Sequence, residues 1–206
     1  MSCGAERQPE RKESLVVVRA AGILVKRETK QGAEFLLGRR RTRLEEGRFS
    51  PPGGKQEEGE NLLRCAVREL EEETGLSIEP TDLVLICGGE QRFLKTGAIF
   101  DYEGFLVTWR PEMEEPQNLE SEKHGPWEWL RREEMEDFLA RDELSASAEL
   151  MWKGFLRYED YRLGLISGDC FESLREDMAR ARLLEEVFPE RFREEKLLFR
   201  ISREYL

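Results

Sequence analysis

The alternation of apolar and polar residues over the first two thirds of the chain predicts strands and helices in an α/β order. Five segments rich in aliphatic and β-branched residues are predicted strands: residues 14–25, 34–38, 83–90, 98–109 and 127–130. The first two strands would pair through a turn at residues 30–32, and Gly88-Gly89 would form a bulge or a turn. A helix is expected near residues 133–139.

Residues 53–76 join a glycine loop to an amphipathic helix that carries an acidic run. Successive helical residues turn by about 100°, so Glu69, Glu72 and Glu73 fall on one face of this helix. Arg68 lies at the margin of that face. The apolar stripe of the helix occupies a different face and has four members: Leu63, Ala66, Val67 and Leu70. The helix is therefore expected to bury one side and present three carboxylates beside it.

Residues next to these acids in the sequence indicate where the acidic face and the helix end. Glu71 points away from the acidic face and from the apolar stripe. Gly75 is a natural stop, because the residue just past a helix end often adopts a positive φ. Pro52-Gly53-Gly54 predicts a loop in which the backbone approaches another group closely.

Three clustered carboxylates repel one another unless a cation lies between them. Oxygen ligands of this kind suit Mg²⁺ or Mn²⁺, and Mg²⁺ combines a few protein carboxylates with water and substrate phosphate oxygens. Such a metal neutralises a polyphosphate and activates a water for attack on phosphorus. Arg68 could hold one carboxylate in place through a fork of hydrogen bonds. The pattern therefore indicates hydrolysis of a phosphoanhydride.

These residues together resemble the Nudix box, GX5EX7REUXEEXGU with U an aliphatic residue. Every defined position is matched: Gly54, Glu60, Arg68, Glu69, Leu70, Glu72, Glu73, Gly75 and Leu76. The chain is thus similar to the Nudix hydrolases. The resemblance implies an α/β/α sandwich with a mixed central sheet. It also implies cleavage of a nucleoside diphosphate linked to another group, with Mg²⁺ as cofactor and Mn²⁺ as a substitute.

The resemblance also implies roles for individual residues. Glu72 and Glu73 would be the principal metal ligands, and Glu69 would be a further ligand or the catalytic base. The carbonyl of Gly53 would complete the metal site. Three residues would support the loop, the helix and the catalytic carboxylates: Glu60, Arg68 and Gly75.

The substrate is less closely defined than the metal site. Residues 120–129 resemble a loop of MutT-like nucleoside triphosphate pyrophosphatases, in which Glu120 or Glu122 would supply another ligand or the general base. We therefore expect hydrolysis of a nucleoside triphosphate, including modified or oxidised dNTPs, to a monophosphate and pyrophosphate. The alternatives are a diphosphate-linked substrate, such as ADP-ribose, a sugar nucleotide or a dinucleoside polyphosphate, and a Nudix-fold sensor that binds a nucleotide without turnover.

Candidate substrate-binding residues come from basic, glycine and aromatic positions around the box: Arg39, Arg41, Gly54, Lys55, Phe49 and Trp127. The arginines could steer or grip phosphates, and an exposed strand end with solvated arginines is an equally good interpretation. Aromatic rings could stack on a base, although such rings more often belong to a core. His124 is the only histidine, and it is expected to be a surface loop residue.

Composition narrows the class of protein. The 206 residues suit one domain, or one domain with an extension. A net charge of -11, from 44 acidic and 33 basic residues, argues against a nucleic-acid polymer as partner. Four scattered cysteines predict no disulfide framework, and no apolar run approaches the length of a membrane span. A cytoplasmic enzyme is the default expectation.

The two ends of the chain are predicted to lie outside the compact Nudix domain of residues 14–140. Residues 1–13 are polar and expected to be disordered. Residues 141–206 are expected to form a helical extension packed on the domain, with helices at 146–161, 171–187 and 190–206. Such an extension could stabilise the domain, cover the substrate pocket, form a homodimer or bind another partner.

Overall fold

A computed structural model of the chain describes residues 17–93, 98–164 and 195–200. The tail expected to be disordered, residues 1–13, and the helix expected at residues 171–187 lie outside the described residues.

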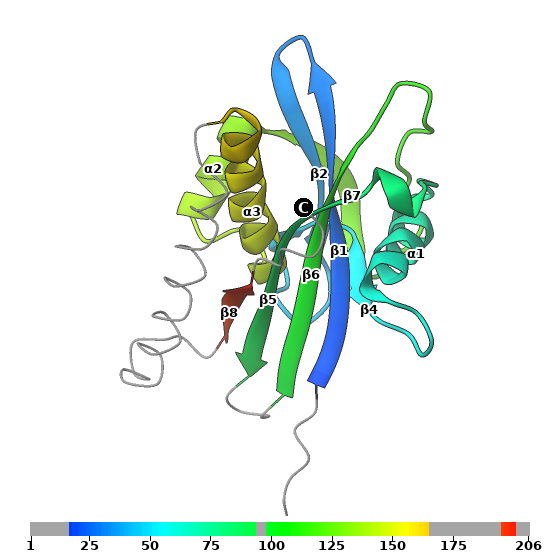
Figure 1. The fold of residues 1–206 in the computed structure, drawn as a ribbon, viewed down its shortest axis with the longest axis vertical. Coiled ribbons are helices and arrows are strands. Elements are labelled where there is room, and N and C mark those ends of the chain that lie inside the picture. The colour runs from blue at the N-terminus through cyan, green and yellow to red at the C-terminus, as the bar shows by residue number, and fades with distance from the viewer. Residues whose placement is uncertain (1–16, 94–97, 165–194, 201–206) are drawn as a thin grey trace, which may run out of the picture.

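The centre of the molecule is one mixed, eight-stranded sheet (Figure 1). Six strands follow the order β3-β2-β1-β6-β5-β8: Phe49–Ser50, Gly32–Arg40, Val17–Thr29, Ala98–Thr108, Val84–Phe93 and Glu195–Arg200. Two shorter partners complete it, β4 (Gly53–Lys55) on β1 and β7 (His124–Arg131) on β2. The β1–β6 pair is parallel and the other pairs are antiparallel, which confirms the expected mixed sheet.

The strand pairings follow the sequence pattern, except that the irregularity in β5 lies at a different residue. β1 and β2 form the expected hairpin, in which Thr29 pairs with Gly32 across the turn. Gly88 and Gly89 do not form a bulge or a turn, because both stay in register with β6. The register shift falls near Ile86 instead. A bulge depends on the strand opposite as well as on local glycine content, and the local sequence shows only the second.

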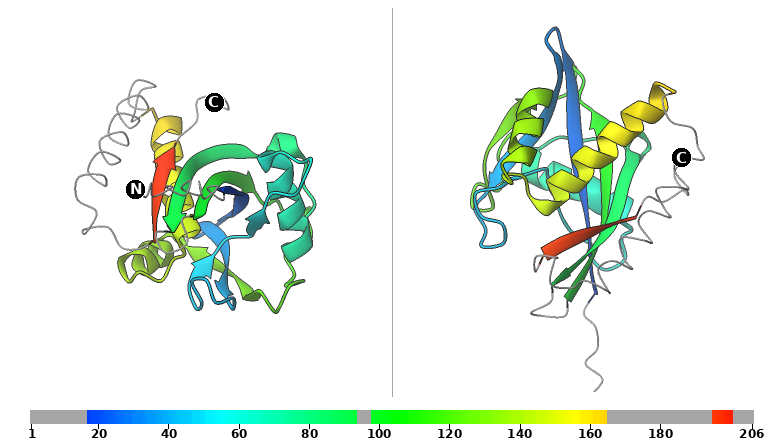
Figure 2. Two further views of the ribbon diagram at one scale, coloured as in Figure 1. Left: turned by 90° about the horizontal axis from the view of Figure 1, so that it is seen from below. Right: turned by 90° about the vertical axis from the view of Figure 1, so that its left-hand side faces the viewer.

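In the described part of the chain, α-helices α1, α2 and α3 cover the two faces of the sheet (Figures 1 and 2). α1 (Leu62–Thr74) lies on one face, while α2 (Arg132–Ala140) and α3 (Ala146–Arg162) lie on the other. Alternate residues of each central strand therefore enter different cores. On β1, Ile23 packs toward α1 and Leu24 packs toward α3. This arrangement confirms the predicted α/β/α sandwich.

α3 is joined to the sheet by a buried aromatic core. Trp152 and Phe155 are buried and contact Phe35 of β2, with ring centroids 5.0 and 4.8 Å from the Phe35 ring. Met151 is buried in the same cluster. The first helix of the predicted extension therefore packs directly on the sheet.

The prediction of a third helix in that extension, at residues 190–206, is wrong over part of this range. Residues Glu195–Arg200 form β8, which pairs antiparallel with β5. Without β8, β5 would present a row of unpaired backbone N–H and C=O groups at the edge of the sheet. Pairing across that edge satisfies these groups, and such long-range contacts override a helical period in the local sequence.

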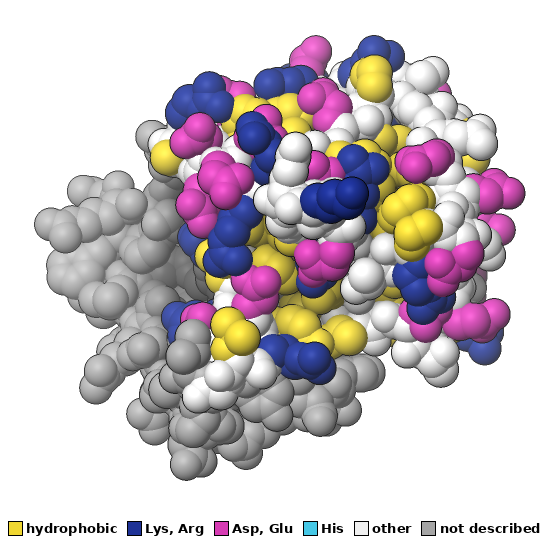
Figure 3. Space-filling view, turned by 90° about the horizontal axis from the view of Figure 1, so that it is seen from above, with side chains coloured by type: hydrophobic (Ala, Val, Ile, Leu, Met, Phe, Trp, Pro, Cys, Tyr) yellow, Lys and Arg dark blue, Asp and Glu magenta, His cyan; other side chains and the backbone are white. Residues whose placement is uncertain are grey.

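The described surface carries charges of both signs. Figure 3 shows basic side chains interspersed with acidic ones on the face seen from above, with apolar side chains between them. Among the described cysteines, Cys65 and Cys87 are buried free thiols.

Candidate active site

The helix that carries the acidic run is fixed at both ends. The Asn61 side chain caps its N-terminus by accepting from the backbone N–H of Arg64 at 2.9 Å. At its C-terminus Gly75 adopts a left-handed φ of 73°, and its N–H donates to the Glu71 carbonyl. The fully buried stripe turns further toward Leu62 and Cys65 than the sequence indicated.

That stripe packs against alternate residues of the central strands, including Ile23, Val25 and Phe105. The helix rotation that this packing imposes also decides where the carboxylates lie. Glu69 and Glu73 are buried beside the stripe, whereas the Glu72 side chain is 50% exposed. The three predicted acids therefore share one end of α1 but differ in their contact with solvent.

The glycine loop lies directly against these acids. β4 pairs with β1, which places Gly53 opposite Gly22 and Gly54 opposite Ala21. A Cβ atom at Gly54 would lie 2.4 Å from the carboxylate atoms of Glu69, so only glycine leaves room for that carboxylate. The backbone N–H of Gly53 donates to Glu73 Oε2 at 2.9 Å.

Arg68 connects the acids to the loop. Its Nη1 donates to Glu69 Oε1 at 2.8 Å and to Glu72 Oε2 at 3.0 Å. On its other side, Nε and Nη2 donate to the two oxygens of Glu60, at 3.2 and 2.7 Å. Nη2 also donates to the Lys55 carbonyl at 3.0 Å. One guanidinium therefore holds two of the predicted catalytic carboxylates and the loop in a fixed relation.

The pKa values of two carboxyl groups in this cluster are shifted in opposite directions. The pKa of Glu60 is lowered, chiefly by its hydrogen bonds from Arg68. The pKa of Glu69 is raised, because burial penalises its charged form and Glu73 adds like-charge repulsion. Burial also raises the pKa of the Cys65 thiol to about 12, so this thiol is protonated at neutral pH.

The donor set fits a hard divalent cation in its chemistry. Glu69, Glu72 and Glu73 carry carboxylate oxygens of the kind that such a cation accepts, and a cation would relieve the repulsion between the like charges of Glu69 and Glu73. Within the described part of the chain, no three acidic, histidine or cysteine side chains already converge as a metal site. The reason is visible in the contacts: Arg68 binds Glu69 and Glu72, while Glu73 turns toward Gly53 and His124.

A loop that was predicted to be near the substrate docks on the C-terminal end of α1. The backbone N–H of Leu119 and the indole Nε1 of Trp127 both donate to the Glu73 carbonyl, at 3.1 and 3.2 Å. The N–H of Gln117 donates to the Thr74 carbonyl at 2.8 Å. These contacts satisfy carbonyl groups that a helix end otherwise leaves without a partner. We call residues 116–127 the docking loop, although its last four residues are the first four of β7.

His124 is not the surface residue that the sequence suggested. It is 4% exposed, and its Nε2 lies 3.2 Å from Glu73 Oε1. The contact joins residues that are far apart in the chain, so no local signal in the sequence could have found it. Lys123, another residue the sequence did not single out, pairs with Glu120 at 2.5 Å. The pKa of Lys123 is raised, first by Glu120 and then by the charges of Glu73 and Glu69.

The two acids proposed for this loop differ in their environment. Glu120 is half-buried and held by Lys123, and its backbone carbonyl accepts from the N–H of His124 at 3.2 Å. Glu122 is exposed to solvent. Glu120 is therefore the more restrained of the two.

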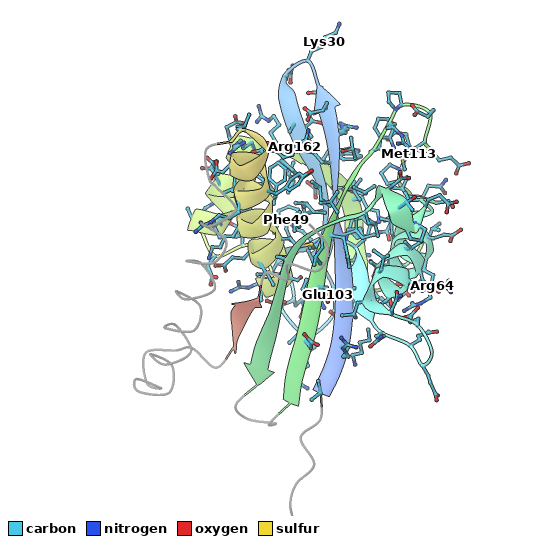
Figure 4. All side chains as sticks on the ribbon, viewed as in Figure 1. Lys30, Phe49, Arg64, Glu103, Met113 and Arg162 are labelled. Atoms are coloured by element: carbon cyan, nitrogen blue, oxygen red, sulfur yellow. The ribbon has the colours of Figure 1, made fainter. Side chains whose placement is uncertain are left out.

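The predicted binding residues do not all gather at α1. Arg41 Nη1 donates to the Ser121 carbonyl at 2.7 Å, so Arg41 contacts the docking loop. Arg39 instead lies over the Phe49 ring at 4.1 Å and donates to the Gly47 carbonyl. Phe49 is 1% exposed, on the α3 side of the sheet, and packs against Phe138 (Figure 4). A ring this deeply buried belongs to the core, and this placement argues against the predicted role of Phe49 in stacking on a base.

Trp127 and Lys55 lie nearer the acids. The Trp127 ring stacks on His124, with centroids 5.1 Å apart, and its other contacts include the backbone of Gly38. Lys55 contributes its carbonyl to Arg68, and its side chain is exposed. The structure thus brings the box residues and the docking loop together, whereas the guanidinium of Arg39 lies over Phe49 instead.

A model of the NUDIX domain family matches residues 17–151. The chain belongs to the NUDIX family. The match spans β1 through the first third of α3, so it includes the glycine loop, α1 and the docking loop. Membership confirms the resemblance drawn from the box and the sandwich fold. It also confirms the expectation of an enzyme, a hydrolase that cleaves a phosphoanhydride bond of a nucleotide derivative.

Solved structures with the NUDIX fold align over most of the described chain. A MutT NUDIX hydrolase from Burkholderia pseudomallei is 22% identical, with 67% of this chain and 97% of that chain covered and a TM-score of 0.53. The NUDIX domain of Shewanella oneidensis NrtR, solved with ADP ribose, is 16% identical, with 74% and 93% covered and a TM-score of 0.53.

A third neighbour is a bifunctional NMN adenylyltransferase/ADP ribose pyrophosphatase from Francisella tularensis, solved with AMP and a Mn ion. It is 16% identical, with 72% of this chain and 43% of that chain covered and a TM-score of 0.54. At these identities the likeness shows the fold alone. NUDIX hydrolases use a divalent metal. Separately, none of the helices in the described ranges is long and apolar enough to cross a membrane.

Proposed function

We propose that this NUDIX hydrolase uses Mg²⁺ to cleave a nucleoside triphosphate, including modified or oxidised dNTPs, into a nucleoside monophosphate and pyrophosphate. The observation that carries the proposal is the cluster at the end of α1. There Glu69 and Glu73 lie against the Gly53-Gly54 loop, and Arg68 holds Glu72 beside Glu69. Mn²⁺ is expected to substitute for Mg²⁺, since both accept carboxylate oxygens.

Each residue of the cluster has a distinct task in this proposal. Glu72, Glu73 and the Gly53 carbonyl would hold the metal, and Glu69 would be a further ligand or the base. When bound, the metal supplies charge neutralisation for the polyphosphate and a more acidic water. Arg68 keeps Glu69 and Glu72 side by side through hydrogen bonds of 2.8 and 3.0 Å.

The docking loop contributes a second acidic position. Glu120 or Glu122 would act as general base or as an additional ligand. Their different environments favour Glu120, because Lys123 restrains its carboxylate at 2.5 Å and the loop is fixed on α1. Among the predicted substrate-binding residues, the side chains of Arg41 and Trp127 donate hydrogen bonds to the docking loop and to the end of α1, respectively.

The proposal also names a substrate class, which depends on the group attached to the nucleoside diphosphate. A likeness between residues 120–129 and MutT-like enzymes favours a triphosphate. Two neighbours in structure are described with ADP ribose or as an ADP ribose pyrophosphatase, which supports diphosphate-linked substrates as the second candidate. A sensor that binds without turnover ranks third, because every acid of the box is present. A cytoplasmic location and a homodimer remain predictions.

The test is hydrolysis across a panel in the presence of Mg²⁺. The panel contains ordinary and oxidised dNTPs, ADP-ribose, sugar nucleotides and diadenosine polyphosphates, with products identified by chromatography. Glu72→Gln serves as the matched inactive control, so that contaminating phosphatase activity is recognised. Selective release of pyrophosphate from a triphosphate supports the proposal. Turnover only of ADP-ribose or another linked diphosphate replaces it with the second candidate, and binding without turnover points to a sensor.

A further inference from the structure

The two oxygens of the Glu73 carboxylate are held by partners from different parts of the chain. Oε2 accepts from the backbone N–H of Gly53 at 2.9 Å, and Oε1 lies 3.2 Å from His124 Nε2. The Glu73 and His124 side chains are 2% and 5% exposed. A polar contact between two side chains this deeply buried acts in a low dielectric, where the attraction is stronger than it would be in water.

The chemistry of the contact assigns the hydrogen. A carboxylate only accepts, so the His124 nitrogen that faces Glu73 carries the hydrogen. The other ring nitrogen, Nδ1, is buried and has no hydrogen-bond partner among the described residues. Within the described chain, the side-chain polar contact of His124 is thus the one with Glu73. This is an unusual use of a buried imidazole, whose two nitrogens are normally both satisfied.

The docking loop fixes the orientation of the ring. The imidazole stacks on Trp127 at an interplanar angle of 27°, and the Trp127 indole donates to the carbonyl of Glu73 itself. The Asn118 amide donates to the carbonyls of His124 and Gly125, at 3.1 and 2.9 Å. Backbone and side chain of the same glutamate are therefore held by one loop, so a change in ring position would be felt by the Glu73 carboxylate.

We propose that His124 is a positioning residue for Glu73: its Nε2–H holds Oε1 so that the carboxylate is pre-oriented to bind the divalent metal. The inference rests on the proposed function, in which Glu73 is a principal ligand. Each carboxylate oxygen has two lone pairs, so it can accept a hydrogen bond and bind a cation together. Partners that hydrogen-bond a ligating carboxylate typically change metal affinity by about 10- to 100-fold when removed.

Two variants separate the polar contact of Nε2 with Glu73 from the packing of the ring. His124→Phe keeps an aromatic ring against Trp127 but has no donor for Glu73. His124→Gln loses the ring, but its amide can present an N–H where Nε2 lies. Mn²⁺ affinity is measured by electron paramagnetic resonance on the full chain, together with kcat and its dependence on Mg²⁺ concentration. Thermal unfolding of each variant records any loss of fold.

We expect His124→Phe to weaken Mn²⁺ binding by about 10- to 100-fold and His124→Gln to stay within about threefold of the wild type. Activity of His124→Phe should recover at high Mg²⁺, because the ligand remains and only its orientation is lost. If His124→Phe does not fold, His124→Asn takes its place, since the shorter amide cannot reach Oε1 from the position of Nδ1.

Three results would overturn the inference. They are wild-type Mn²⁺ affinity in the variant without the donor, equal losses in the Gln and Phe variants, and a loss of activity that no concentration of Mg²⁺ restores. Failure of the proposed function looks different, because the wild-type protein itself would then neither bind Mn²⁺ nor hydrolyse any nucleotide of the panel. That result would remove the inference as well.

Discussion

The two faces of one sheet are covered by helices that bury opposite kinds of side chain. On one face, α3 contributes Trp152 and Phe155, which close on Phe35 in a core of aromatic and aliphatic residues. On the other face, α1 buries Glu69 and Glu73 beside its apolar stripe. Both helices are anchored by the same strands, since consecutive residues of β1 point to opposite faces.

The difference indicates what each face does. Burying aromatic area stabilises the fold, whereas burying two like charges costs free energy unless hydrogen bonds or a cation compensate. On the α1 face, the compensation comes from Arg68, from the Gly53 N–H and from His124. A cluster with that cost and that many dedicated partners is better explained by chemistry than by stability. The α3 face needs no such explanation.

The largest expected effect is on activity at the α1 face. Glu72→Gln should lower kcat by about three to four orders of magnitude, or about 4–5 kcal/mol in barrier height, because a metal ligand is lost. The free energy of unfolding should change by less than about 1 kcal/mol, since Glu72 is half-exposed and its pair with Arg68 is screened by solvent. Steady-state kinetics and urea denaturation on one preparation check both values. Near-normal turnover would remove Glu72 from the metal site.

The opposite pattern is expected on the α3 face. Phe35→Ala should lower the free energy of unfolding by about 3–5 kcal/mol, because a buried ring that contacts Trp152 and Phe155 is replaced by a cavity. The kcat per folded molecule should stay near the wild-type value. Urea denaturation gives the first quantity, and kinetics corrected for the folded fraction give the second. A specific loss of kcat without loss of stability would mean that the two faces are not separable in this way.

The sequence predicted the α1 face of the sheet better than the α3 face. The spacing of the box located α1, its C-terminal glycine and the three acids, because short-range geometry on a helix depends only on the local sequence. The same reasoning placed five strands, β1, β2, β5, β6 and β7, to within a few residues. It did not predict the short strands β3 and β4, and it predicted a loop where β4 begins at Gly53. It could not foresee that His124 meets Glu73 or that Phe49 lies in the core, because both facts depend on residues that are distant along the chain.

β8 shows that secondary structure, too, can depend on residues that are distant along the chain. The apolar residues near the C-terminus have a helical period, yet Glu195–Arg200 is a strand on the edge of β5. The preference of this segment is set by a partner about one hundred residues earlier, which no window of local sequence contains.

A smaller effect, on stability, is expected from the ion pair between Glu60 and Arg68 on the α1 face. Glu60→Gln should lower the free energy of unfolding by about 1–3 kcal/mol at neutral pH, because Arg68 loses a charged partner at 2.7 Å. Arg68 lowers the pKa of Glu60 from its usual 4.5, so the unfolded chain binds this proton more readily than the folded one. The stabilisation is therefore fully present above about pH 4.5 and is lost as the pH falls through the folded pKa.

Denaturation of both proteins between pH 7 and pH 3 tests the sign of this linkage. The difference between wild type and Glu60→Gln should shrink toward acid pH. A difference that stays constant, or grows, would show that the ion pair between Glu60 and Arg68 is not what stabilises the loop.

The smallest expected effect comes from the residue next to Glu72. The Glu71 side chain is exposed, and its backbone carbonyl accepts from the N–H of Gly75. Glu71→Gln removes the same charge as Glu72→Gln from the same turn, so it controls for a general effect of net charge on substrate binding. We expect kcat within about twofold of the wild type and a stability change within about 0.5 kcal/mol, measured side by side with Glu72→Gln. A loss of activity as large as that of Glu72→Gln would mean that the acidic face of α1 is turned differently in the working enzyme, with Glu71 rather than its neighbour toward the metal.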